Sequence, residues 1–205
     1  MSSHQDPLAN ENGRRALLQS IVALTLSVFG AKACSIMRFD EDARELVFEA
    51  VAGEGEGALV GRRIPASTGI AGWSLASEEP ISIDDVLSHP RFDREVAEQT
   101  GYIPTKLTVF PLLHGEESLG VLSVLDAGAT AHFGLAGMQS LGHFASHAAM
   151  ALAAVEAARR GERSRAAAPL ASLAAAIDSL DSERRRQTLA LIAALEPLIR
   201  RQDDA

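Results

Sequence analysis

The sequence predicts an α+β fold in which an antiparallel sheet is flanked by helices. Apolar residues recur at three- and four-residue spacing over residues 14–29 and 135–160, as they do on amphipathic helices. Between these segments lie two pairs of strand-like runs, each pair joined by a short polar turn. Because such short connections join neighbouring antiparallel strands, we expect two hairpins in one sheet, covered by the two helices.

The first helix is expected over residues 14–29, and Gly30 follows as a natural stop. Its apolar stripe is widened by Val22, Leu26 and Phe29 to an arc broader than contact with one sheet requires. We therefore expect this helix to pack on the sheet and on a second neighbour.

Residues 14–34 also have features of an export signal, because two arginines precede an apolar run and small residues precede Cys34. Asp6 and Glu11 make the leader less basic than such signals, and we treat export as the lesser alternative. Cys34 is the only cysteine, so no intrachain disulfide can form and a reducing compartment is favoured. We expect a cytoplasmic protein with no membrane partner, since no apolar run reaches the ~20 residues that span a bilayer.

The first hairpin is expected from ACSIMRF and RELVFEAVAG, which are separated by the polar residues 40–43. The second is expected from KLTVFPLL and SLGVLSVLDA, which are joined across HGEE. Both pairs predict adjacent antiparallel strands.

The segment between the hairpins is less regular. TGIAGWSLAS predicts a short helix with Ser67 or Thr68 as its N-cap, and EPISIDD predicts a short strand that begins at a proline. The glycine-rich residues 53–57 lack the Lys-Ser/Thr ending of a phosphate loop, so we interpret them as a flexible turn.

The closing helix over residues 135–160 should place one side on the sheet. Its other side, with His143, His147 and Met150, is left for a second helix. Pro169 predicts a break, followed by a helical hairpin or one long kinked helix with Asp181 or Ser182 as a cap and with Leu191, Leu195 and Leu198 in register. The domain organisation is thus a disordered arm at 1–13, a folded domain at 14–160 and a helical extension at 161–205.

The charge balance argues against a nucleic-acid partner. The formal net charge is -8, which repels phosphate backbones. Residues 162–205 carry seven arginines and seven acidic residues, so the tail is neutral rather than basic.

Taken in order, the first helix, the first hairpin, GIAGWSLASEEPISIDDV, HPRF, the second hairpin and the closing helix resemble a GAF domain from Arg14 to Ala158. The resemblance implies a profilin-like antiparallel sheet of five or six strands, with the N- and C-terminal helices on one face and the irregular segments on the other. It also implies a regulatory module that encloses a small molecule or forms dimers through its terminal helices. Gly69 and Gly72 would then let the short helix pack close to the sheet.

Some activities found within this family do not match the sequence. Free methionine sulfoxide reductases depend on several cysteines, and one cysteine cannot support thiol-disulfide turnover. The motifs of bilin photoreceptors and of cyclic-nucleotide-binding members are missing. No cofactor can be named from the sequence.

Nine residues in or beside the irregular segments are candidates for ligand binding: Trp73, Asp84, Asp85, Arg91, Phe92, Tyr102, Lys106, Thr108 and Phe110. Each has a structural alternative. Trp73 would more often fill a core, and we expect at least one of Asp84 and Asp85 to cap the segment that starts at Val86. Strand alternation puts Lys106, Thr108 and Phe110 on one face, which either looks into the pocket or turns the lysine to solvent.

No catalytic set is present, so we do not expect an enzyme. His143 and His147 have a spacing able to bind a metal but no third ligand, and we expect no metal site. The leading hypothesis is a non-catalytic regulatory or sensor protein that binds an unidentified small molecule and forms a homodimer through its terminal helices. The alternative is a protein-protein interaction module with a closed pocket, which binds another protein through residues 162–205.

Overall fold

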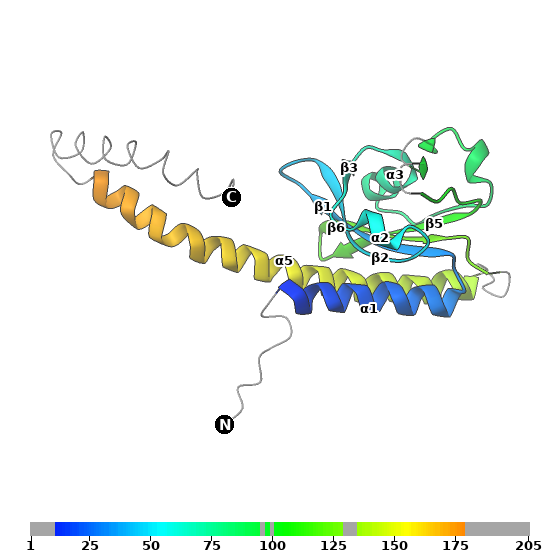
Figure 1. Ribbon diagram of the computed structural model, residues 1–205, viewed down its shortest axis with the longest axis horizontal. Coiled ribbons are helices and arrows are strands. Elements are labelled where there is room, and N and C mark those ends of the chain that lie inside the picture. Colours follow the sequence, from blue (N-terminus) through cyan, green and yellow to red (C-terminus); the bar gives the residue numbers. More distant parts are fainter. Residues whose placement is uncertain (1–10, 95–96, 99–100, 129–134, 179–205) are drawn as a thin grey trace, which may run out of the picture. The chain divides into compact units, whose positions relative to one another are not determined.

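The computed structural model describes residues 11–94, 97–98, 101–128 and 135–178. The chain divides into two compact units, Met1–Ala157 and Ala158–Ala205, and the first contains the whole sheet (Figure 1). Of the disordered arm expected at residues 1–13, residues 1–10 lie outside the described part of the chain, and the expectation is wrong for residues 11–13, which are helical. The tail residues 179–205, with the leucines and the helix cap that were expected there, also lie outside the described part.

The sheet has six strands, and every neighbouring pair is antiparallel. The strands are β1 (Ala33–Asp40), β2 (Glu45–Gly53), β3 (Arg63–Pro65), β4 (Ile81–Ile83), β5 (Leu107–His114) and β6 (Glu117–Leu125). Their order is β3-β2-β1-β6-β5-β4, so β1 and β6 are the central pair. The predicted α+β class and both predicted hairpins are confirmed.

Two short elements were not predicted. The helix α2 (Glu56–Leu59) begins inside the segment interpreted as a flexible turn, after Gly55 with its positive φ of 80°. The edge strand β3 pairs with the start of β2, from Glu45 opposite Pro65 to Val47 opposite Arg63. A strand of three residues is too short to show a recognisable alternation of apolar and polar residues. Pairing with β2, and not the local sequence, makes these residues a strand.

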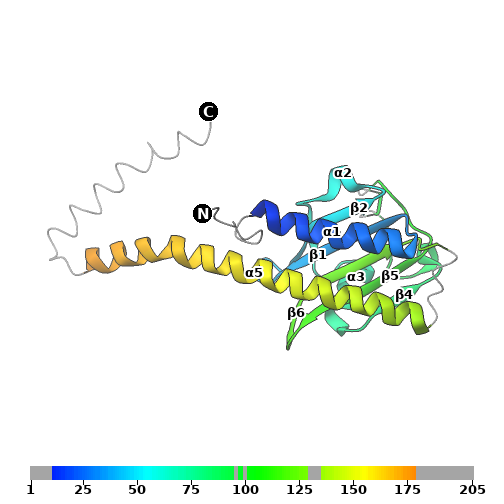
Figure 2. The ribbon, with the colours of Figure 1, turned by 90° about the horizontal axis from the view of Figure 1, so that it is seen from below.

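Two helices cover one face of the sheet, as expected (Figure 2). The helix α1 (Glu11–Phe29) begins before Arg14 and is followed by Gly30 at φ +55°. The helix α5 (Leu135–Asp178) lies beside it, and the rings of Phe29 and Phe144 meet edge-to-face at 5.7 Å. The segment that resembled an export signal is thus part of the folded unit, because it forms most of α1 and the start of β1.

The expected break at Pro169 is wrong, because α5 continues through it to Asp178. A proline removes one backbone donor and clashes with the preceding turn, but it leaves the other helical hydrogen bonds in place. The flanking AAAPLASLAAA is rich in alanine and leucine, which have high helix propensity. This local preference offsets the cost of the proline.

The sheet is buried on both faces because alternate residues of each central strand enter different apolar clusters. On β1, Cys34 and Ile36 pack under α1 and α5, whereas Met37 packs on the opposite side. A bulge opposite Ile36 and Met37 inserts Glu49 into β2, where it accepts a 2.8 Å hydrogen bond from Arg38.

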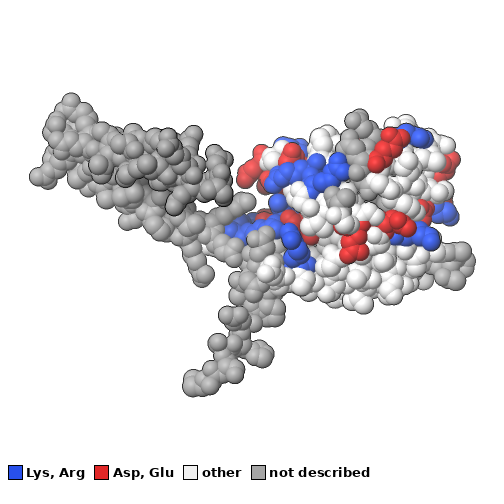
Figure 3. All heavy atoms as spheres, viewed as in Figure 1, with Lys and Arg blue, Asp and Glu red and all other residues white. Residues whose placement is uncertain are grey.

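The surface of the described residues gives two further observations. On the face seen in Figure 3, acidic and basic side chains are interspersed over the first unit. No described helix combines the length and the hydropathy that crossing a membrane requires.

Replacing Gly120 by alanine should lower the free energy of unfolding by about 2–4 kcal/mol. Gly120 has φ +155°, and a Cβ there would lie 2.0 Å from the carbonyl oxygen of Met37, between the two central strands. Urea denaturation measures the change. Gly57→Ala is the matched control, because no atom lies within 4 Å of its Cβ position, and it should change stability by less than about 1 kcal/mol. Equal effects of the two substitutions would contradict this account of the central pair.

Candidate ligand pocket

A cavity of about 130 Å³ lies on the face of the sheet opposite α1 and α5. Its floor is formed by central strands. Its roof is formed by α3 (Gly69–Ser77) and by five residues that follow η2 (Val86–Ser88) in the chain: Phe92, Asp93, Ala97, Tyr102 and Pro104. Most of the lining is apolar, with side chains such as Met37, Phe48, Val51, Ile70 and Leu107. The predicted short helix is therefore confirmed, and it covers a cavity.

Two glycines set the position of α3, though not as expected. Gly69 has φ +62°, which favours glycine. A Cβ at Gly72 would lie 2.5 Å from the carbonyl oxygen of Ala66, so the close approach is to the 66–67 segment and not to the sheet. Thr68 is the N-cap residue, as one of two expected candidates, but its side chain makes no capping hydrogen bond.

The roof is fastened to the end of β6 by Asp126. The phenol of Tyr102 donates a hydrogen bond to one carboxylate oxygen of Asp126. The other oxygen accepts bonds from the backbone N–H groups of Thr105, at 2.9 Å, and Lys106, at 2.7 Å. Burial of the Tyr102 phenol, together with its hydrogen bond to Asp126 and the charge of that carboxylate, raises its pKa to about 12.

Of the nine candidate residues, Phe92 and Tyr102 line the cavity. Trp73 instead stacks on His89, with ring centroids 5.8 Å apart and planes at 16°. The guanidinium of Arg91 lies 5.1 Å from the centre of the same indole. Trp73 and Arg91 therefore brace the segment that leads into the roof, outside the cavity lining.

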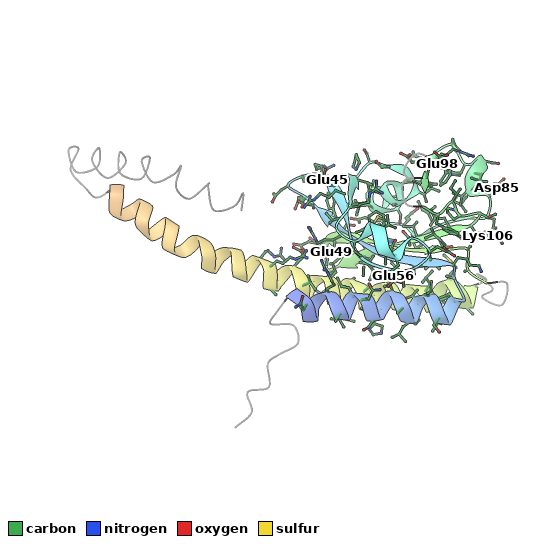
Figure 4. All side chains as sticks on the ribbon, viewed as in Figure 1. Glu45, Glu49, Glu56, Asp85, Glu98 and Lys106 are labelled. Atoms are coloured by element: carbon green, nitrogen blue, oxygen red, sulfur yellow. The ribbon has the colours of Figure 1, made fainter. Side chains whose placement is uncertain are left out.

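The charged candidates lie at the surface. Lys106 and Asp84 form an ion pair at 3.3 Å, with 58% and 90% of their side chains exposed. Asp85 is the N-cap residue of the short 3-10 helix η2 (Val86–Ser88), as one of the two expected candidates, but its side chain makes no capping hydrogen bond. Figure 4 shows Lys106 and Asp85 at one end of the sheet, far from Glu45.

Thr108 and Phe110 share a strand face, as alternation predicted, but this face looks toward the helices. The Thr108 hydroxyl forms a 2.9 Å hydrogen bond with that of Ser82, and Phe110 belongs to the cluster under α1 and α5. Leu107, the residue before Thr108, lines the cavity instead.

Sequence reasoning missed Ser35 on β1 and Ser123 on β6, which are both buried and line the cavity floor. Both are lone polar residues within otherwise apolar strand runs, ACSIM and GVLSVL. A lone serine in an apolar strand was the feature that could have identified these residues, because a hydroxyl group at such a position needs a hydrogen-bonding partner.

The described residues offer little for catalysis or metal binding. Burial raises the pKa of the Cys34 thiol to about 12, although a hydrogen bond with Thr25 acts in the other direction. The thiol is therefore protonated at neutral pH and is a poor nucleophile. Within the described ranges no three His, Cys, Asp or Glu side chains gather to hold a metal, and His143 and His147 are exposed on α5.

The ionisation of Tyr102 should be directly measurable, because it is the only tyrosine in the chain. Near-ultraviolet absorbance should show phenolate forming near pH 12 and not near pH 10, with Tyr102→Phe as the blank. Asp126→Asn should lower this pKa while leaving it above about 10, because burial is the larger cause. Since the folded-state pKa is raised, the contribution of Tyr102 to stability should be constant below pH 10 and be lost between pH 10 and 12. A wild-type titration near 10 would contradict the fastened roof.

The fold and the sequence both match known proteins. A family model of the GAF domain matches residues 13–152. The GAF domain of a phosphoenolpyruvate-protein phosphotransferase from Coxiella burnetii is similar with a TM-score of 0.63 at 23% identity, over 70% of this chain and 84% of that one. The free methionine-R-sulfoxide reductase of Neisseria meningitidis, solved with its substrate, gives a TM-score of 0.58 at 24% identity, over 74% and 84% of the two chains.

The second GAF domain of DevS from Mycobacterium smegmatis gives a TM-score of 0.56 at 21% identity, over 72% of this chain and 98% of that one. At such identities the solved structures share the fold with this chain and show nothing of its ligand. The family match covers most of the first unit, including both hairpins and α3. The chain belongs to the GAF domain family.

Proposed function

We propose that this protein is a non-catalytic regulatory module that senses a small molecule in the cavity under α3 and acts as a homodimer. The observation that carries the proposal is the cavity itself, which lies between a rigid sheet and an irregular roof. Family members serve generally as regulatory domains that bind small molecules. A cavity with an apolar lining and few polar groups is the usual form of such a site.

The non-catalytic part of the proposal rests on the chemistry of the described residues. The only thiol is buried and protonated, and the cavity lining contains no histidine. The similar reductase from Neisseria meningitidis is an enzyme, but at 24% identity that likeness concerns the fold alone. A single buried cysteine also fits a cytoplasmic location.

The dimer is supported by the outer surface of the helix layer. Leu24 and Val28 on α1 are each 59% exposed, and they lie one helical turn apart. Met150 on α5 is 51% exposed, and His143 and His147 precede it on the exposed part of that helix. An apolar strip on two adjacent helices suits an isologous interface, in which the same patch of both subunits meets.

A second candidate function is an interaction module that works through its C-terminal helices. One observation favours it: α5 continues to Asp178, well beyond residue 152, where the family match ends. Residues 162–205 would then bind a protein partner while the cavity stays closed.

Ligand binding should be detectable by thermal shift with a panel of amino acids, cyclic nucleotides, haem and single-ring aromatic compounds. A ligand of the cavity raises the free energy of unfolding by about 2.7 kcal/mol at a hundred times its dissociation constant. Ala71→Phe should abolish the shift, because Ala71 lines the cavity and the added ring fills it. Ala76→Phe, on the exposed side of the same helix, should retain the shift. Flat curves throughout would favour the interaction module.

Dimerisation should depend on the strip on α1. Leu24→Glu combined with Val28→Glu should weaken self-association at least about tenfold, since it places like charges opposite each other in a symmetric interface. Analytical ultracentrifugation measures the association. Leu87→Glu is the control, because Leu87 is 47% exposed on η2, away from the helix layer. A double variant that still dimerises would rule out this interface, and loss of the dimer on deleting residues 162–205 would assign it to the tail.

A further inference from the structure

Two hydroxyl groups face the cavity from its floor. Ser35 on β1 and Ser123 on β6 are 6% and 4% exposed, and both line the cavity. Neither hydroxyl is among the described polar atoms that are completely buried without a partner, so both oxygens are open to the cavity. A hydroxyl group that opens into a mostly apolar cavity is available to hydrogen-bond with whatever occupies it.

The register of the central strands brings these hydroxyls together. Ser35 lies directly opposite Ser123 in the antiparallel pairing of β1 with β6. Residues opposite each other in this way have Cβ atoms about 4.5–5.5 Å apart on one face of the sheet. One polar group of a ligand can therefore reach both hydroxyls, each of which can donate or accept a hydrogen bond.

The charges around the cavity argue against an anion. Among the described residues, the charged members of the lining are Glu54 and Asp93, with no lysine, arginine or histidine beside them. Of the cations near the cavity, Arg91 lies over Trp73 and Lys106 pairs with Asp84. The hydroxyl groups of the floor do not by themselves offset the desolvation of an ammonium group, and a cationic ligand would have to place its charge beside Glu54 or Asp93 and not on the floor.

The volume limits the size of the occupant. The cavity measures about 130 Å³. An apolar protein cavity of about 150 Å³ accommodates one benzene molecule, whereas a nucleotide or a haem is several times larger.

We propose that the cavity binds a neutral molecule of single-ring size, whose one hydroxyl or carbonyl group hydrogen-bonds to Ser35 and Ser123 while its apolar body contacts Met37, Phe48 and Ile70. This inference rests on the proposed sensing function and names the chemical class of the ligand. The serine pair selects the polar group, and the acidic residues of the lining exclude carboxylates of the same size.

Three probes of similar size test the proposal on the full chain by calorimetric titration: benzyl alcohol, toluene and benzoate. Benzyl alcohol should bind about three- to tenfold more tightly than toluene, which lacks the hydrogen bond. Benzoate should bind at least about tenfold more weakly than benzyl alcohol, because its charge would be buried without a cation. Benzoate binding as tightly as benzyl alcohol would overturn the proposal.

The role of the serines is tested by Ser35→Ala combined with Ser123→Ala. This variant should lose the preference for benzyl alcohol over toluene while still binding toluene. Ser118→Ala is the matched control, because it removes a hydroxyl from the same strand, β6, at a position outside the cavity lining, and it should keep the preference. A preference that persists in the double variant would overturn the assignment. If the double variant fails to fold, the ranking of the three probes by affinity for the unmodified protein still tests the proposed ligand class.

Failure of this inference can be separated from failure of the proposed function. If none of the three probes binds, but a larger or charged compound stabilises the protein and Ala71→Phe abolishes that effect, the cavity is a sensor site and the ligand class is wrong. If no compound binds, and Ala71→Phe changes nothing but stability, both are wrong.

Discussion

The pairing of β1 with β6 is the constraint on which the rest of the first unit depends. These strands come from opposite ends of the domain sequence, and each brings its own hairpin, so their pairing joins two local units into one sheet. The register sends Cys34 and Val124 toward the helices and Ser35 and Ser123 toward the cavity. A shift by one residue would exchange these faces and place the two hydroxyls in the helix-covered core. The absence of a side chain at Gly120 lets the strands approach closely enough to hold the register.

The same strand also anchors the helix that leaves the domain. Arg38 on β1, 11% exposed, contacts Glu49 on β2 at 2.8 Å and Glu156 on α5 at 3.2 Å. Asp40 also lies 3.7 Å from this guanidinium, so removing Arg38 would leave three partly buried carboxylates without this partner, which is costly. Glu156 lies immediately before the end of the first unit at Ala157, so α5 is fixed to the sheet at its last residues within that unit. Ser35 lies three residues before Arg38 on β1, and its side chain is on the opposite face of the strand.

The sequence alone was sufficient to predict those helices and strands whose apolar periodicity extends over many neighbouring residues. The hairpins, α1 and α3 follow from periodicity and turn residues, whereas β3 and α2 are too short to carry a pattern and depend on contacts with β2. Alternation correctly placed Thr108 and Phe110 on one face, but it does not say which face a helix will cover. Trp73 and Arg91 were candidates for ligand binding, with core filling the favoured alternative for Trp73. Trp73, on α3, instead contacts Arg91 and His89 in the segment that follows η2. Ser35 and Ser123 were overlooked because a single serine in an apolar strand stands out only when its partner strand is known.

The floor and the roof of the cavity are linked through β6. Ser123 contributes a hydroxyl to the floor, and Asp126, just after the end of the strand, holds the roof through Tyr102 and two backbone N–H groups. Leu125, between them, lines the cavity and pairs with Leu107 at the start of β5. If a ligand bonds to Ser123, as we propose, it contacts the strand that holds the roof, and any effect of the roof on ligand affinity must be matched by an equal effect of the ligand on the roof. The opposite face of β6 packs under α1 and α5, so this one strand contacts both the cavity and the helix layer.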